Sequence, residues 1–177
     1  MKLVVLDRDG VINQDSPQYI KTPEEWKPIP NALAAIARLN QAGFRVVVAT
    51  NQSAIGRGLL DTPTFNAIND KMVKALAQFG GRLDALFYCP HAPEAACACR
   101  KPNTGMFMDI MRRFNTHFDG VPCVGDALRD LQAAQAVGGQ PVLVLTGKGK
   151  ATLQEGGLPQ DTLIFSDLAE AVASITE

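Results

Sequence analysis

Short runs of aliphatic and β-branched residues recur along the chain, separated by segments whose apolar residues follow helical spacing. Continuous apolar runs are typical of strands that are buried on both faces, as in parallel sheets. Six such runs occur, at residues 3–6, 44–50, 85–88, 122–125, 141–145 and 162–165. The alternation predicts an α/β fold with a doubly wound parallel sheet, its strands joined by right-handed crossovers.

The helical segments are marked by apolar stripes and by residues that start or stop helices. We expect helices near 31–42, stopping at Gly43, and over 62–79, with Thr62 and Pro63 as cap and first position. A third helix is expected behind Thr104 up to residue 114, and short helices should follow Asp126 and Asp167.

Two connections, 11–30 and 89–103, are long for a compact domain, and loops of that length are usually functional. In open parallel sheets, ligands bind beyond the carboxyl ends of the strands where the strand order reverses. Asp7, Thr50, the 89–103 connection and Asp126 all follow predicted strands. We therefore expect them to converge on one site.

Two aspartates one residue apart end the first apolar run, in the segment KLVVLDRDG. Side chains alternate along an extended backbone, so Asp7 and Asp9 should face one way and Arg8 the other. Two close carboxylates repel when both are charged, so such a pair persists where a cation neutralises it or one member holds a proton. This pattern indicates phosphoryl-transfer chemistry, although an aspartate before a turn, such as Asp126, can also be a simple cap.

Length and charge narrow the possible functions. The 177 residues fit one domain, 1–177, and the 17 basic and 18 acidic residues give a net charge of −1 with no block of like charges. The sequence therefore has no cluster of basic residues that would indicate binding to nucleic acid or to a membrane surface. The sequence shows neither a signal peptide nor an apolar stretch approaching the roughly 18 residues of a membrane span. We expect a cytoplasmic protein.

The connection after the third strand holds a cluster of metal-binding residue types. Three thiols and an imidazole suit tetrahedral Zn²⁺, and a site filled by four protein ligands is structural. Its expected task is to hold the loop that carries Arg100 and Lys101; the alternatives are a disulfide, from Cys97 to Cys99 or Cys89, or free thiols. The expected zinc ligands are Cys89, His91, Cys97 and Cys99.

The order and spacing of four motifs resemble the haloacid dehalogenase (HAD) superfamily over nearly the whole chain. The motifs are DRDG at 7–10, TN at 50–51, RKP at 100–102, and GD at 125–126 with Asp130. Within that superfamily, the segments DRDGVIN, TNQSAIGRG and CPHAPEAACACRKP are similar to the small zinc-containing heptose-bisphosphate phosphatases, with histidinol-phosphate phosphatases as close relatives.

The resemblance implies a Mg²⁺-dependent phosphatase in which Asp7 is the nucleophile and forms an aspartyl-phosphate. Asp7, Asp126 and the backbone carbonyl of Asp9 are the candidate Mg²⁺ ligands, because hard oxygen donors suit this ion. Asp9 is the expected acid and base, with a raised pKa, so Asp7 should be charged and Asp9 protonated. Thr50 and Lys101 should donate to the phosphoryl oxygens.

Only about forty residues separate Asp9 from Thr50, which leaves no room for an inserted cap domain. The site should therefore be open, and the chain should act as a monomer on a small sugar bisphosphate, the heptose 1,7-bisphosphate that the resemblance implies. The alternative for the polar residues around it is a solvated rim. The candidate substrate contacts are Arg8, Asp15, Tyr19, Asn51, Gln52, Ser53, Arg57 and Arg100.

Ala127 departs from the resemblance, because heptose-bisphosphate phosphatases often carry lysine there, and the spacer from His91 to Cys97 is short. The substrate is therefore less firmly indicated than the reaction. Histidinol phosphate is the alternative substrate, and a zinc-stabilised binding module without activity is the alternative of a different class.

Overall fold

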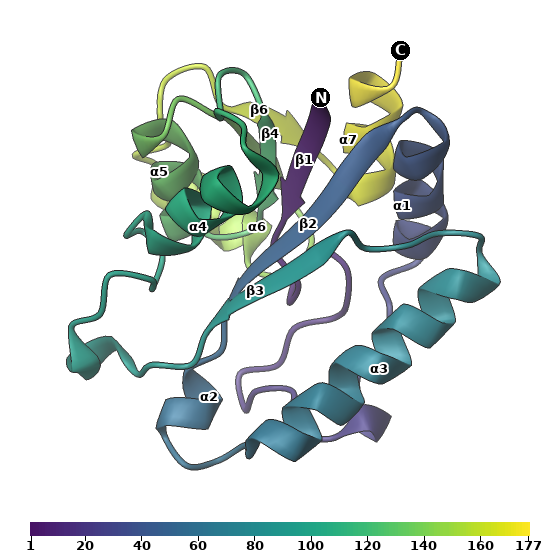
Figure 1. The fold of residues 1–177 in the computed structure, drawn as a ribbon. Coiled ribbons are helices and arrows are strands. Elements are labelled where there is room, and N and C mark those ends of the chain that lie inside the picture. The colour runs from purple at the N-terminus through teal and green to yellow at the C-terminus, as the bar shows by residue number, and fades with distance from the viewer.

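One six-stranded parallel sheet forms the centre of the protein (Figure 1), whose computed structural model describes all 177 residues. The strand order is β3-β2-β1-β4-β5-β6. The predicted α/β class and all six strands are confirmed. The strands are β1 Lys2–Leu6, β2 Phe44–Asn51, β3 Ala85–Cys89, β4 Pro122–Gly125, β5 Gln140–Val144 and β6 Leu163–Phe165.

Helices cover both faces of the sheet. The first face carries α1 (Ala32–Gln41), α3 (Thr62–Gln78) and α7 (Leu168–Ile175); the second carries α4 (Gly105–Phe114) and α5 (Leu128–Ala136). These five helices were predicted. The sequence pattern did not predict α2 (Ser53–Gly56), α6 (Gly149–Glu155) or the 3₁₀ turns Pro23–Glu25 and Pro93–Ala95, which are too short to show a period.

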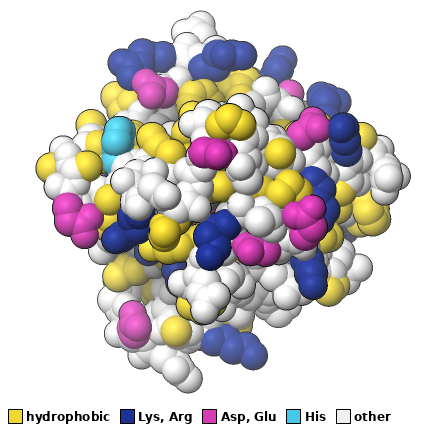
Figure 2. Space-filling view, turned by 90° about the horizontal axis from the view of Figure 1, so that it is seen from below, with side chains coloured by type: hydrophobic (Ala, Val, Ile, Leu, Met, Phe, Trp, Pro, Cys, Tyr) yellow, Lys and Arg dark blue, Asp and Glu magenta, His cyan; other side chains and the backbone are white.

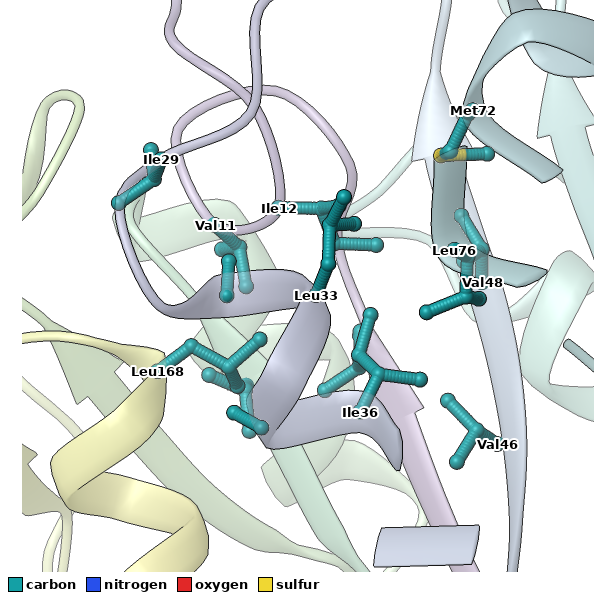
Figure 3. Close-up of a cluster of buried hydrophobic side chains, with 14 of the residues drawn as sticks. Val11, Ile12, Ile29, Leu33, Ile36, Val46, Val48, Met72, Leu76 and Leu168 are labelled. Carbon is teal, nitrogen blue, oxygen red and sulfur yellow. The ribbon is translucent and has the colours of Figure 1, made fainter. Parts of the chain in front are cut away.

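Each face of the sheet has its own apolar core, because successive strand side chains point to opposite sides. Val4 and Leu6 belong to a cluster of 26 buried residues under α1, α3 and α7. Leu3 and Val5 belong to a cluster of 12 under α4 and α5. Figure 3 shows the larger cluster, in which Val11 and other residues of the 11–30 connection pack beside the helices. This connection is therefore anchored to the core.

The start of α3 differs by one residue from the prediction. Asp61 is the cap: its carboxylate accepts a hydrogen bond from the Thr64 N–H at 2.8 Å, and Thr62 is the first helical residue. A carboxylate at this position satisfies a free N–H group and interacts favourably with the helix dipole. The prediction that Thr62 caps the helix is wrong for this reason.

The strand order reverses between β1 and β4, so the chain leaves these two neighbouring strands in different directions. β1 pairs with β2 on one side and with β4 on the other. Between Asp9 and Thr50 the chain forms only a loop, a 3₁₀ turn, α1 and β2, so the predicted absence of an inserted cap is confirmed. None of the helices has the length and apolarity needed to cross a membrane.

Candidate active site

Three buried carboxylates meet at the carboxyl ends of β1 and β4. The Asp7 N–H donates to the Val124 carbonyl at 2.9 Å, which extends the pairing of the two strands and places Asp7 beside Asp126. Asp130, on the first turn of α5, completes the group. One oxygen from each of the three carboxylates lies within 4.8 Å of the others. The sequence prediction that Asp7 and Asp126 converge is consistent with this geometry.

The packing around Asp126 requires glycine at two positions. A Cβ on Gly10, whose φ is +85°, would lie 2.0 Å from Asp126 Oδ2, and one on Gly147 would lie 2.3 Å from the same atom. The Lys148 N–H donates to this oxygen at 2.9 Å. Two backbone segments, at Gly10 and at residues 147–148, therefore close around one carboxylate, which fixes its direction.

Burial and repulsion between the carboxylates disfavour the ionised forms of Asp7 and Asp126. Burial, followed by the charge of Asp130, raises the pKa of Asp7 well above its ordinary value and raises that of Asp126 to about 7. A divalent cation beside these carboxylates would lower both pKa values, because an opposite charge favours the ionised form. Buried carboxylate oxygens are the donors that Mg²⁺ prefers, so Asp7 and Asp126 fit the predicted magnesium site.

Lys101 is buried among these carboxylates. Its ammonium lies 2.7 Å from Asp130 Oδ1 and 3.3 Å from Asp7 Oδ1, and it donates to the Ala49 carbonyl at 2.6 Å. Burial lowers its pKa, but Asp130 and then Asp7 outweigh that effect, so the pKa of Lys101 lies above its ordinary value. The side chain is therefore a fixed positive charge beside Asp7.

The pKa of Asp9 shifts in the direction opposite to the predicted one. Burial raises its pKa, but the charge of Arg8 and hydrogen bonds from Arg8, Asn13 and Gln52 outweigh burial, so the pKa of Asp9 lies below its ordinary value. The prediction of a raised pKa for Asp9 is therefore wrong for the metal-free protein, in which the raised pKa belongs to Asp7. The reason is that the cationic neighbour of Asp9 is Arg8 in its own motif, whereas burial and two carboxylates surround Asp7.

Arg8 was a candidate substrate contact, and the structure contradicts this. Its side chain has no exposed surface, and its guanidinium donates to Asp9 Oδ1 at 2.9 Å and to Asn69 Oδ1 at 3.1 Å. The alternation along the strand turns Arg8 away from Asp7 and into the protein, where it lies over the Phe65 ring. It contacts Asp9 rather than the cavity.

Asn51 and Gln52 lie in the cavity wall, but their side-chain groups also bind the protein. The Asn51 amide donates to the Lys101 carbonyl at 3.1 Å and accepts from the Lys101 N–H at 3.0 Å, so it ties β2 to the loop that carries Lys101. The Gln52 amide donates to Asp9 and Thr50. Both residues therefore support catalytic groups in addition to facing the cavity.

A cavity of about 230 Å³ opens over the carboxylates. Side chains of both signs intermingle on the face viewed from below the sheet (Figure 2). The cavity wall also contains Arg129 and Lys148, which were not predicted. Arg129 could have been predicted, because it lies only three residues after Asp126. The predicted residues that line the cavity are Asp7, Asp9, Asp15, Tyr19, Thr50, Asn51, Gln52, Ser53, Arg57, Arg100, Lys101 and Asp126.

The four predicted zinc ligands come together in the structure. The Cys89 sulfur lies 2.9 Å from that of Cys99 and 3.5 Å from that of Cys97, and His91 Nδ1 lies 3.3 Å from the Cys99 sulfur. All four ligand atoms lie within 4.8 Å of one another, and three thiols with an imidazole suit tetrahedral zinc, so the cluster fits this ion by its donor set. All four cysteines are free, so neither alternative disulfide is formed.

The chain is similar to known proteins in both sequence and structure. A HAD-hydrolase-like family model matches residues 98–171. The D-glycero-β-D-manno-heptose-1,7-bisphosphate 7-phosphatase of Bordetella bronchiseptica is 56% identical over 177 residues, which covers 100% of this chain and 99% of that protein. The enzyme of the same name from Pseudomonas putida is 53% identical over 169 residues, covering 96% of each chain.

The chain belongs to the D-glycero-β-D-manno-heptose-1,7-bisphosphate 7-phosphatase family. Its members are phosphatases of the HAD superfamily. A crystal structure of the Bordetella bronchiseptica D,D-heptose 1,7-bisphosphate phosphatase, complexed with magnesium and phosphate, matches with a TM-score of 0.98 and 57% identity, covering 99% of this chain and 98% of that one. The corresponding structure from Burkholderia thailandensis gives a TM-score of 0.80 at 50% identity, with the same coverage.

One departure from the heptose-bisphosphate phosphatase pattern is offset within the cavity. Ala127 is buried and its N–H donates to Asp130 Oδ2 at 3.1 Å, so it brings no cation. Lys148 reaches the same cavity from the segment after β5, and its ammonium lies 3.7 Å from Asp15 Oδ2. The cavity of this family member therefore contains a lysine that comes from a different element.

Proposed function

We propose that this chain removes the C7 phosphate of D-glycero-D-manno-heptose 1,7-bisphosphate and releases heptose 1-phosphate and inorganic phosphate, as a step in nucleotide-activated heptose supply for lipopolysaccharide. The observation that carries the proposal is the group formed by Asp7, Asp126 and Lys101 beneath an open cavity with cationic walls. The names of its relatives over the full chain length support the same substrate.

The reaction begins when one Asp7 oxygen attacks phosphorus and the bond from phosphorus to the C7 oxygen breaks. Lys101 balances the charge of Asp7, and Thr50 lies in the cavity wall, where its hydroxyl can donate to a phosphoryl oxygen. Mg²⁺ held by Asp7, Asp126 and the Asp9 carbonyl would offset the charge of the phosphate and keep both carboxylates ionised.

Asp9 moves the proton in both halves of the reaction. A phosphate dianion beside Asp9 raises the pKa of this carboxyl, because a like charge disfavours the ionised form. Asp9 then protonates the leaving C7 oxygen. In the second half it takes a proton from water, which attacks phosphorus and releases phosphate from Asp7.

The second phosphate of the substrate accounts for the cations of the cavity wall. Arg100 Nη1 is buried without a hydrogen-bond partner in the protein, so it has a donor ready for an anionic group. Arg57, Arg129 and Lys148 line the same cavity. Guanidinium groups bind phosphate through paired hydrogen bonds, which favours a doubly phosphorylated substrate over one with a single phosphate.

We propose further that residues 1–177 act as one domain and as a monomer in the cytoplasm, with Zn²⁺ in the Cys89–Cys99 loop. The residues that the proposed reaction uses, Asp7, Asp9, Asp126 and Lys101, all belong to this chain, so the reaction requires no residue from a second copy. Sedimentation velocity at micromolar concentration would test this part, and a stable dimer would contradict it.

The experiment for the reaction is phosphate release from a substrate panel with and without Mg²⁺. We expect heptose 1,7-bisphosphate to be hydrolysed at C7, as read by phosphorus NMR, well above heptose monophosphates and histidinol phosphate. Asp7→Asn should lower kcat by about 10⁴-fold or more, as loss of a nucleophile does in other enzymes. Asp109→Asn, on the exposed surface of α4, is the matched control.

Two results would overturn the proposal. Turnover of histidinol phosphate far above that of any sugar phosphate would change the substrate. Absence of release that depends on both Mg²⁺ and Asp7, from every member of the panel, would support a zinc-stabilised binding module instead.

A further inference from the structure

Gln52 occupies a buried position between the two catalytic groups that flank the phosphate site. It follows Thr50 and Asn51 at the end of β2, is 5% exposed, and its backbone N–H donates to the Cys89 carbonyl at 2.8 Å. Its side-chain nitrogen donates to Asp9 Oδ2 at 3.1 Å and to Thr50 Oγ1 at 2.8 Å. One amide group therefore binds both residues at once.

The bonds from Gln52 leave each catalytic group one defined direction for its remaining hydrogen bond. Asp9 Oδ1 already accepts from Arg8 Nε and from Asn13 Nδ2, each at 2.9 Å, whereas Oδ2 accepts only from Gln52. Oδ2 is thus the oxygen with a free position for the leaving group. Because Thr50 Oγ1 accepts from Gln52, its own hydrogen must point elsewhere, and its other contact, to the Asn51 carbonyl, is long at 3.5 Å.

A buried arginine sets the orientation of this amide. Arg8 Nη2 faces Gln52 Oε1 at 3.4 Å, and a guanidinium can only donate. A reversed Gln52 amide would place its NH₂ against Arg8 and its oxygen against the Asp9 carboxylate, so both contacts would become repulsive. Arg8 itself is fixed by Asn69 Oδ1 at 3.1 Å and by the Phe65 ring, 5.7 Å from its guanidinium carbon.

We propose that Gln52 is a positioning residue that orients Asp9 Oδ2 toward the leaving oxygen and the Thr50 hydroxyl toward the phosphoryl group. In this arrangement, Arg8 and Asn69 on α3 are positioning residues that keep the Gln52 amide in the productive orientation. The inference rests on the proposed phosphatase function and adds residues to its acid step.

The experiment compares two leaving groups. An alkoxide needs the proton from Asp9, whereas nitrophenolate is stable without one, so kcat/KM for p-nitrophenyl phosphate reports the attack of Asp7 with little contribution from the acid. We expect Gln52→Met to lower kcat/KM for the best primary alkyl phosphate of the panel about 100-fold, and that for p-nitrophenyl phosphate at least tenfold less. Asn69→Leu should change the ratio of the two values in the same direction by a smaller factor. Gln78→Met, on the exposed end of α3, is the background control.

Equal losses on both substrates would overturn the inference, because general damage to the site lowers both alike. An unchanged ratio in both variants would also overturn it. Thermal melting by circular dichroism checks folding; if Gln52→Met does not fold, Asn69→Leu carries the test alone. Failure of the proposed phosphatase activity is separate, since the wild-type protein would then hydrolyse neither substrate, and a different best substrate would leave this comparison of leaving groups unchanged.

Discussion

At the scale of single residues, the site is governed by how buried charges are balanced. Lys101 is the only cation in contact with both Asp7 and Asp130, and this contact raises the pKa of Lys101 and lowers that of Asp130, whereas burial and Asp130 outweigh it at Asp7. Burial opposes the ionised form of Asp130, but Lys101 outweighs it, so the pKa of Asp130 lies below its ordinary value. Lys101 therefore favours the ionised form of both buried carboxylates, and its effect outweighs burial at Asp130.

Lys101→Met should destabilise the protein and the loss should depend on pH. At pH 8 we expect the free energy of unfolding to fall by about 3 kcal/mol, because removing one member of a buried ion pair leaves the other uncompensated. The depressed pKa of Asp130 gives stability that is present above its unfolded value and lost as the pH falls through the folded value. In the variant, burial raises this pKa, so Asp130 is neutral at low pH.

The difference between wild type and Lys101→Met should therefore shrink from pH 8 to pH 4, as measured by urea denaturation. Lys74→Met removes an exposed lysine that pairs with Asp70 on α3 and should leave stability unchanged. A difference that grows toward low pH would contradict this account of Lys101.

At the scale of elements, the 89–103 connection runs from the edge strand β3 to α4 and carries Arg100 and Lys101, two cations that line the cavity. It packs closely on its neighbours: a Cβ on Gly56 would lie 2.6 Å from the Pro90 carbonyl oxygen, and one on Gly105 would lie 2.5 Å from the Ala98 carbonyl oxygen. Cys99 directly precedes Arg100 and Lys101. A metal at the cluster would therefore hold the backbone at the point where these side chains begin.

Zinc analysis should find about one ion per chain, and Cys97→Ser should reduce zinc content and lower the melting temperature before it affects chemistry, because loss of a ligand removes binding energy that contributes to folding. Cys123→Ala, at a buried cysteine of β4 outside the cluster, should leave the zinc content unchanged. A zinc-free native protein with full stability and activity would show that the loop needs no metal.

At the scale of the whole molecule, the strand order brings together the residues of the proposed magnesium site. Asp7 and Asp126 are more than a hundred residues apart in the chain, and they meet because β4 lies directly beside β1. The raised pKa of Asp126, about 7, is a property of this assembly, since burial and Asp130 produce it. Folding therefore creates a group of carboxylates whose charge the proposed Mg²⁺ would balance.

Mg²⁺ should stabilise the protein more as the pH rises through 7. Below pH 7 Asp126 must lose a proton before it can bind the ion, so the increase in melting temperature at fixed Mg²⁺ should be larger at pH 8 than at pH 5.5. Without metal, the raised pKa of Asp126 means that its contribution to stability falls as the pH rises from about 4 to about 7. Calorimetry with and without Mg²⁺ measures both trends.

Asp126→Asn is the informative variant for this prediction. It should remove most of the Mg²⁺-dependent increase at every pH, because an amide is a weaker ligand and carries no charge. Asp119→Asn, at an aspartate before the turn that leads into β4, should behave as wild type. A Mg²⁺ effect that is independent of pH would contradict the role assigned to Asp126.

Local features of the sequence determined most of the fold and the identity of the reacting groups. Apolar runs of strand length and stripes of helical period predicted all six strands and five helices, because burial on a sheet or a helix face imposes a period on the chain. The spacing of Asp7 and Asp9, and of the residues from Cys89 to Cys99, predicted clusters because neighbours in sequence are neighbours in space.

Only the tertiary structure decided in which direction the pKa of each candidate catalytic group shifts and what the neighbouring side chains contact. The low pKa of Asp9, the burial of Arg8 and the contacts of Gln52 depend on residues from α3 and β2 that fold against the first loop. The strength of electrostatic interactions depends on distance and on the exclusion of water, and neither quantity exists until the chain has folded. Sequence spacing could therefore predict the candidate acids, whereas the arrangement of the folded chain set the direction in which their pKa values shift.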